Sequence, residues 1–218
     1  MTFKLTKADY LAIAKEDADY LNEKGANFYK QEDYATAIEY YRIAAAMGNS
    51  YSICNLGYCY MYARSIEKNM SLALAYFKIA AERNDVDALY KLGNIYKHGI
   101  SEEGVEADEE LALYYYRTAL SQIEEQFLDK FSYPSLYFSL AKEHLENGKL
   151  ITDYGMAYRM LKIAKEGYER EIENGVKFRA GVLDSIEEIL QDPKFERYIA
   201  NEDDYAFDDD DYSFLEED

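Results

Sequence analysis

The sequence predicts an all-α solenoid of stacked helix pairs, and three observations lead to this fold class. The 218 residues include only two prolines and eleven glycines, which are too few turn-forming residues for the many short turns of a sheet protein. Alanine, leucine, glutamate and lysine, which favour helices, are abundant. A short motif with helical spacing also returns four times along the chain, as expected for a repeat protein.

Each copy of this motif has an alanine, an aromatic residue or leucine four positions later, and a second alanine seven positions later. Residues four and seven apart share a helix face, and the small residues let a neighbouring helix come close to the ring. The motif therefore predicts the second helix of each pair. The copies are Ala37-Tyr41-Ala44, Ala73-Phe77-Ala80, Ala112-Tyr116-Ala119 and Ala157-Leu161-Ala164.

A second motif precedes each copy and predicts the first helix of each pair. It has an aliphatic residue, a small residue directly after it and an aromatic residue three positions further on. The two inner copies are complete, while Lys24 replaces the aliphatic residue before Gly25, and His144 replaces the aromatic residue after Leu140-Ala141. The complete copies are Leu56-Gly57-Tyr60 and Leu92-Gly93-Tyr96.

These motifs resemble the tetratricopeptide repeat and its relative, the Sel1-like repeat. The small residue precedes the first alanine by 12, 16, 19 and 16 positions in the four units, so the first resembles an ordinary tetratricopeptide unit and the others resemble the longer Sel1-like type. The resemblance implies a right-handed α-α superhelical solenoid of about four repeats over residues 1–200, with capping helices at both ends. The expected segments are repeats 17–48, 50–84, 85–126 and 133–168, a C-terminal cap at 169–200 and an acidic aromatic tail at 201–218.

The spacing between units reveals an insertion between the third and fourth repeats. The second motif alanine precedes the next small residue by 13, 13 and then 22 positions. The extra residues lie near 121–132, where Ile123, Phe127, Leu128 and Phe131 have roughly helical spacing. We therefore expect an extended helix in this insertion.

Capping residues agree with this division into helices. Thr6 and Asp9 are placed to open an N-terminal capping helix, and a last helix is expected at 176–190, followed by a turn at Asp192-Pro193. Predicted N-caps are Asp33, Asn69, Asp85, Asp108 and Asp153, and predicted stop positions are Gly48, Gly99, Gly148 and Gly175.

The net charge of −19 disfavours two classes of ligand. Residues 202–218 carry ten acids and no base, but residues 1–201 are still negative, at −9. Such a chain repels phosphate groups, so we expect no direct nucleic-acid binding and no membrane binding. Because the N-terminus lacks the pattern of a secretory signal, a cytoplasmic location is expected, with Cys54 and Cys59 as buried, reduced thiols.

The resemblance also implies a binding groove lined by the first helices of the repeats. Tyrosines there would grip an apolar segment of a partner protein and asparagines would bond its backbone. The competing interpretation is that the tyrosines only pack in a thin core. The expected groove residues are Asn22, Tyr29, Tyr51, Tyr58, Met61, Tyr90, Asn94, Lys97, Phe138 and Lys142, with Ala26, Cys54 and Leu145 beside them.

No catalytic or cofactor motif occurs in the sequence. It lacks a phosphate-binding glycine loop, a nucleophile elbow and a His-Glu-x-x-His pattern. His98 and His144 do not stand at ligand spacing from either cysteine, so we expect neither a metal site nor a cofactor. The sequence therefore predicts a protein that is not an enzyme.

Three functions remain open. The first is an adaptor or scaffold that binds a partner segment in its groove. The alternative is an acidic inhibitor or nucleic-acid mimic that acts through its negative face and tail, whose binding would weaken steeply with salt. The third is self-association, with the tail of one chain in the groove of another. The tail carries a possible linear motif of Tyr205, Phe207, Tyr212 and Phe214.

Overall fold

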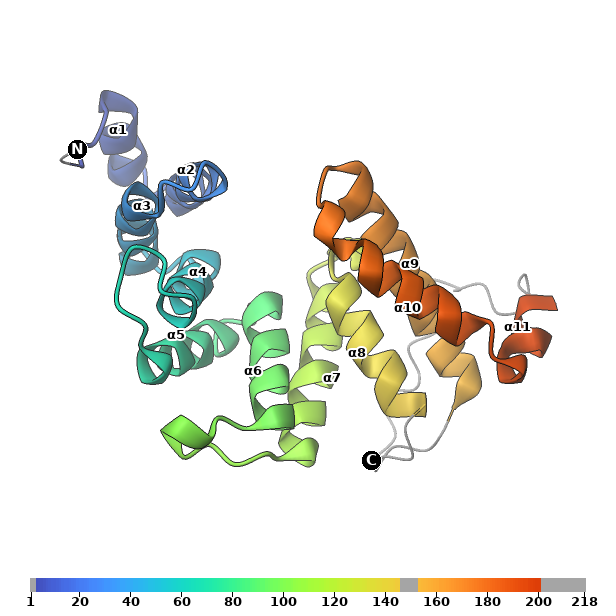
Figure 1. Ribbon diagram of the computed structural model, residues 1–218. Helices are drawn as coiled ribbons and strands as arrows, with labels where there is room; N and C mark the ends of the chain where they lie inside the picture. Colours follow the sequence, from blue (N-terminus) through green and yellow to red (C-terminus); the bar gives the residue numbers. More distant parts are fainter. Residues whose placement is uncertain (1–2, 146–152, 201–218) are drawn as a thin grey trace. The chain divides into compact units, whose positions relative to one another are not determined.

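The computed structural model describes residues 3–145 and 153–200, and most of these residues are helical (Figure 1). They form eleven α-helices and four short 3-10 helices, with no strand among them. No helix in this part of the chain combines the length and apolar character that a membrane crossing requires. The chain divides into two compact units, residues 1–122 and 123–218, and each is described by itself. The expectation of one solenoid domain over residues 1–200 stays a prediction.

The first unit consists of an N-terminal helix followed by three helix pairs (Figure 1). In each pair the first helix carries the motif glycine and the second carries the alanine motif, as predicted. The last helix, α7, continues past the boundary between the units. The elements are α1 (Lys7–Ala14), α2 (Ala18–Lys30), α3 (Tyr34–Ala46), α4 (Ser50–Met61), α5 (Met70–Ala81), α6 (Val86–His98), η1 (Ser101–Glu103) and α7 (Glu109–Glu125).

Close contact between a glycine and a ring joins the helices of each pair. A Cβ atom at Gly25 would lie 2.7 Å from the ring of Tyr41, and one at Gly57 would lie 2.8 Å from Phe77. The same clash would occur between Gly93 and Tyr116. The glycines are therefore required because the aromatic residue of the alanine motif occupies the space of their missing side chain.

A second aromatic contact repeats with the same register. The aromatic residue three positions after the motif glycine stacks on the residue three positions after the first motif alanine. In all three pairs the ring centroids are 5.6 Å apart and the planes lie within 12° of parallel. Such offset stacking stabilises each pair beyond simple burial. The pairs are Phe28 with Tyr40, Tyr60 with Tyr76, and Tyr96 with Tyr115.

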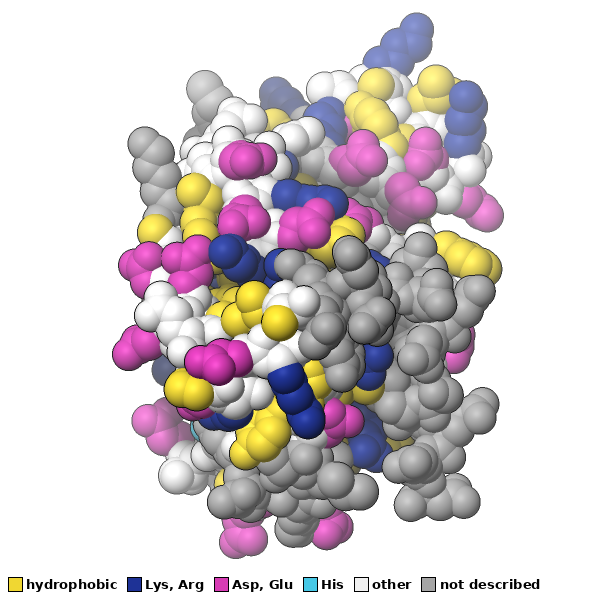
Figure 2. Space-filling model, turned by 90° about the vertical axis from the view of Figure 1, so that its right-hand side faces the viewer, with side chains coloured by type: hydrophobic (Ala, Val, Ile, Leu, Met, Phe, Trp, Pro, Cys, Tyr) yellow, Lys and Arg dark blue, Asp and Glu magenta, His cyan; other side chains and the backbone are white. Residues whose placement is uncertain are grey.

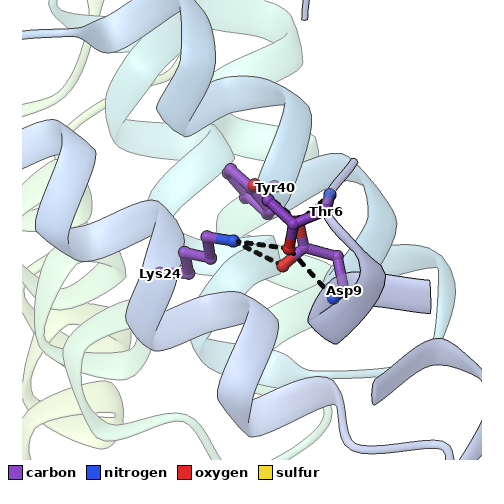
Figure 3. A network of polar contacts seen from close by, with 4 residues as sticks. All are labelled: Thr6, Asp9, Lys24 and Tyr40. Atoms are coloured by element: carbon purple, nitrogen blue, oxygen red, sulfur yellow. Dashed lines mark hydrogen bonds and ion pairs between the residues drawn. The ribbon is translucent and has the colours of Figure 1, made fainter. Parts of the chain in front are cut away.

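The degenerate position Lys24 has a specific partner in the N-terminal helix (Figure 3). Its ammonium group lies 2.5 Å from a carboxylate oxygen of Asp9, whose side chain is fully buried. Asp9 also accepts hydrogen bonds from the Thr6 amide, the Thr6 hydroxyl and the Tyr40 hydroxyl. At the position before the motif glycine, the second and third repeats have Leu56 and Leu92, which pack against the preceding repeat. The first repeat has Lys24 there, which binds the N-terminal capping helix instead.

Most helix boundaries follow the predicted caps. Thr6 and Asp9 form a capping box at α1. The side chains of all five predicted N-cap residues accept a hydrogen bond from a backbone amide of the helix that follows. Gly48, Gly99 and Gly175 have positive φ at or just after helix ends, while Gly148 lies outside the described residues.

The prediction of one extended helix through the insertion is only partly correct. Helix α7 ends at Glu125, where the amides of Phe127 and Leu128 return to the carbonyl oxygens of Glu124 and Ile123. Phe127 takes a φ of 53° and is 95% exposed, so it leaves the apolar face that its spacing suggested. Apolar periodicity alone does not show where the backbone hydrogen bonds of a helix end.

The second unit is built around the long helix α9, which packs against α8 and is covered by the C-terminal helices. Ile186 of α10 and Phe195 of η4 are fully buried, and Tyr198 stacks on Tyr158 of α9 at 5.9 Å. The elements are η2 (Lys130–Ser132), α8 (Pro134–Leu145), α9 (Tyr154–Glu173), η3 (Lys177–Arg179), α10 (Ala180–Leu190), η4 (Pro193–Phe195) and α11 (Glu196–Ala200). On the face shown in Figure 2, acidic side chains lie among basic and hydrophobic ones.

Candidate functional site

The candidate site is one face of the first helices in the first unit, which we call the first-helix face. It comprises the residues six and three positions before the motif glycine and one and four positions after it. These positions share one side of a helix because of its 3.6-residue period. The face consists of Asp19, Asn22, Ala26 and Tyr29 on α2, Tyr51, Cys54, Tyr58 and Met61 on α4, and Asp87, Tyr90, Asn94 and Lys97 on α6.

Three of the four tyrosines on this face use part of the ring for packing. Tyr58 meets Phe77 edge to face at 5.1 Å, Tyr29 meets Tyr34 at 4.9 Å, and Tyr90 lies 6.0 Å from Tyr116. All three remain partly exposed. The packing interpretation therefore applies to part of each ring, and a binding role for the exposed part stays a prediction.

Tyr51 differs from the other three because its side chain is 42% exposed. It lies on α4 one and two turns before Cys54 and Tyr58, on the same side of the helix. Partial burial raises the pKa of Tyr51, and the nearby carboxylates of Asp85, Asp87 and Asp19 raise it further. Tyr51 is thus an open ring in a negative environment.

The two asparagines use their carbonyl oxygens within the fold. Asn22 accepts from the Ser52 hydroxyl at 2.8 Å and from the Asn55 amide at 3.3 Å. Asn94 accepts from the Tyr116 hydroxyl at 2.9 Å. Within the described chain, no acceptor is bonded to either NH₂ group, so these groups are available to donate to the backbone of a bound segment.

The negative charge of the first-helix face lies at the start of the helices, at Asp19 and Asp87. The pKa of Asp87 is raised to about 6, although the residue is exposed. Desolvation of its carboxylate by the surrounding residues is the largest cause, the negative charge of Asp85 adds to it, and Lys91 opposes the shift. The sequence prediction included Tyr51 but missed Asp19 and Asp87, which occupy the same register. Their distance of six residues before the motif glycine was the signal that could have found them.

The remaining predicted residues are divided between the two units. Met61 packs beside the core of the second repeat, and Lys97 is half-buried near the end of α6. In the second unit, the Lys142 ammonium lies 4.7 Å from the ring centroid of Phe138 on α8. That Phe138 and Lys142 extend the same groove stays a prediction. Tyr205, Phe207, Tyr212 and Phe214 lie outside the described residues.

Reactive groups on or near this face are shielded. Cys54 and Cys59 are free thiols, as predicted, and both are buried. Burial raises the pKa of Cys54 and raises that of Cys59 to about 11, so both stay protonated at neutral pH. Among residues 3–145 and 153–200, no three His, Cys, Asp or Glu side chains are grouped so that they could hold a metal ion.

Comparison with a solved structure supports the fold. A Sel1 repeat protein from Oxalobacter formigenes superimposes with a TM-score of 0.57 at 18% identity, over 75% of this chain and 61% of that one. At this identity the likeness concerns the fold alone, which is an all-α superhelical repeat.

Sequence comparison identifies the repeats themselves. The chain is 35% identical over 164 residues to protein sel-1 homolog 2 of Mus musculus, covering 73% of this chain but only 22% of the mouse protein. The model of the Sel1 repeat matches residues 10–49, 50–85, 86–122 and 134–167, well over half of the chain. The chain therefore belongs to the Sel1 repeat family.

Proposed function

We propose that this protein is a non-enzymatic adaptor whose first-helix face binds an extended segment of a partner protein. Sel1 repeat proteins generally mediate protein-protein interactions, which gives the coarse function. The observation that supports this particular face is the exposure of Tyr51, together with the partly exposed rings of Tyr58 and Tyr90. Exposed aromatic side chains are common anchors at protein interfaces.

The asparagine amides support the same binding mode. An extended segment presents backbone carbonyls at regular intervals, and the NH₂ groups of Asn22 and Asn94 stand on α2 and α6, on either side of α4. Neighbouring packed helices lie about 8–10 Å apart, and an extended chain advances about 3.3 Å per residue. A segment of roughly six residues therefore reaches from α2 to α6.

The experiment is an affinity capture from native cell extract with matched tyrosine variants. Tyr51→Ala/Tyr90→Ala removes two rings of the first-helix face, whereas Tyr10→Ala removes a 63% exposed ring from α1, outside this face. We expect a captured partner to be lost with the double variant and retained with Tyr10→Ala. Circular dichroism of each variant checks that the helices are intact.

A deletion of residues 202–218 separates this proposal from its competitors. Loss of the partner with the deletion alone, combined with steep weakening in salt, would instead support the acidic inhibitor or mimic. A partner retained by every variant would place binding on another surface. Light scattering of the full chain and of a chain ending at Ala200 tests self-association through the tail.

A further inference from the structure

One register position places an acid, a tyrosine and an acid on three successive first helices. Asp19, Tyr51 and Asp87 each stand six residues before the motif glycine of α2, α4 and α6, and we call them the acid-tyrosine row. The two acids act electrostatically on Tyr51, since both contribute to its raised pKa. All three side chains are exposed, so a partner can reach them.

The adjacent ring shows how this face accommodates a positive charge. The Lys91 ammonium lies over Tyr58, 5.2 Å from the ring centroid, which is the geometry of a cation-π contact. Lys91 also stands one helical turn after Asp87 and interacts with its carboxylate. Lys91 of the same unit therefore lies over the ring of Tyr58 and interacts electrostatically with Asp87.

Tyr51 lacks such an internal cation. In the part of the chain that the structure describes, no lysine or arginine lies over its ring, although its environment is more acidic. Asp85, Asp87 and Asp19 all act on it. Asp19 keeps an accepting role as well, because it receives a 2.7 Å hydrogen bond from Asn49. A positively charged side chain of a partner would form with the Tyr51 ring the same cation-π contact that Lys91 forms with the Tyr58 ring.

The opposite edge of the first-helix face has a different chemistry. The residues four positions after the motif glycine are Tyr29, Met61 and Lys97, with no acid among them. Arg64 lies near that edge, with its guanidinium 4.8 Å from the ring centroid of Tyr34, and it acts electrostatically on Tyr29. Among the residues of the first-helix face, acids therefore occur only at the edge at which the first helices begin.

We propose that the acid-tyrosine row binds a basic side chain, lysine or arginine, of the partner segment, with the cation over Tyr51 and between Asp19 and Asp87. This inference rests on the proposed function and adds the chemistry of the partner to it. Charge complementarity favours this occupant over an acidic or purely apolar segment. A 12-residue peptide exceeds the roughly six residues that span α2 to α6 at the usual helix spacing, so it can cross all three first helices.

The test is selection of a random 12-residue phage-displayed peptide library on the full chain. Peptides are selected in parallel on Asp19→Asn/Asp87→Asn and on Glu67→Gln/Glu106→Gln. The control removes the same charge from exposed loop residues at the opposite ends of α4 and α6. We expect lysine and arginine to be enriched with the wild type and the control but not with the row variant.

Affinities of one selected peptide, measured by fluorescence anisotropy, complete the test. We expect roughly fivefold weaker binding to the row variant and to Tyr51→Leu, and no change with the control, as for loss of one exposed cation-π or ion-pair contact. Selected peptides without basic residues that still require Tyr51 and Tyr90 would overturn this inference and keep the proposed function. If no peptide is selected above background, or if none depends on the first-helix face, both fail.

Discussion

Tyr116 lies where a side chain on Gly93 would be, and this contact holds the third helix pair together. A Cβ atom on Gly93 would overlap the ring of Tyr116, whose side chain is 1% exposed and cannot move into solvent. Phe77 stands in the same relation to Gly57, and Tyr41 to Gly25. The three glycines are therefore packing positions inside helices, where glycine is otherwise unfavourable.

We predict that Gly93→Ala destabilises the first unit by about 1–2 kcal/mol, because overpacking outweighs the gain in helix propensity. Urea denaturation followed by circular dichroism measures this change. Gly181→Ala is the matched control, since a Cβ atom on this glycine of α10 meets nothing within 4 Å. It should be neutral or slightly stabilising. Equal effects of the two substitutions would contradict the packing explanation.

A second prediction concerns the ion pair that attaches α1. Lys24→Met should destabilise the first unit by about 2 kcal/mol, because it leaves the buried Asp9 carboxylate without its cation. Asp9→Asn in the same chain removes the uncompensated charge and should recover part of the loss. A double variant no more stable than Lys24→Met would show that the charge is not the cause. Thermal unfolding of the four proteins completes the cycle.

The same pair predicts an acid-sensitive contribution to stability. Burial of Asp9 would raise its pKa, but hydrogen bonds from Lys24, Thr6 and Tyr40 outweigh it and lower the pKa from 3.8 to about 2. Because the folded pKa is the lower one, the stabilisation is present above about pH 4 and is lost as pH falls towards 2. It amounts to about 2 kcal/mol at neutral pH.

Wild type and Asp9→Asn should therefore differ in unfolding free energy at pH 6 and converge near pH 2. Urea titrations at these two pH values measure the difference. A constant difference across this range would exclude ionisation of Asp9 as its source.

The two thiols should report opening of the repeats. Cys54 and Cys59 are 3% and 0% exposed, and burial raises the pKa of both. We predict that Ellman's reagent reacts with neither thiol in native protein at pH 8 on the timescale of minutes, and with both in urea. Rapid reaction of one thiol in the native state would show that the second repeat opens locally.

The repeated contacts could be predicted from sequence because they depend on fixed spacing. The glycine of the first helix and the aromatic residue of the second recur together, so their register identified both helices of each pair. Lys24 could only be described as a departure from this register. Its partner, Asp9, belongs to the capping helix and not to a repeat, and repeat spacing says nothing about contacts with a cap.

The candidate site was predicted less completely for a related reason. Aromatic and amide side chains were chosen by residue type, so Tyr51 was included while Asp19 and Asp87 at the same register were not. Acids are abundant in this chain, so residue type alone does not single out Asp19 and Asp87. Their importance is seen only when the helices place them near the ring of Tyr51. The end of α7 at Glu125 was also missed, because Phe127 continues the apolar spacing but turns into solvent.

The last prediction links the acid-tyrosine row to stability. Desolvation of the carboxylate by surrounding residues and the nearby Asp85 raise the pKa of Asp87 from 3.8 to about 6, although the residue is exposed, while Lys91 opposes the shift. Since the folded pKa is the higher one, ionised Asp87 destabilises the fold at neutral pH, and this cost disappears as pH falls from about 6 to about 4. Asp87→Asn should therefore be more stable than wild type at pH 7 and equal to it near pH 4.

Urea denaturation at both pH values measures this difference, and Glu67→Gln is the control for removal of one exposed acid. A stabilising Asp87→Asn that also weakens binding of a basic peptide would show that the carboxylate is kept for binding at a cost in stability, as is common at functional sites. If Asp87→Asn is less stable than wild type at pH 7, the carboxylate stabilises the start of α6 and its presence needs no binding role.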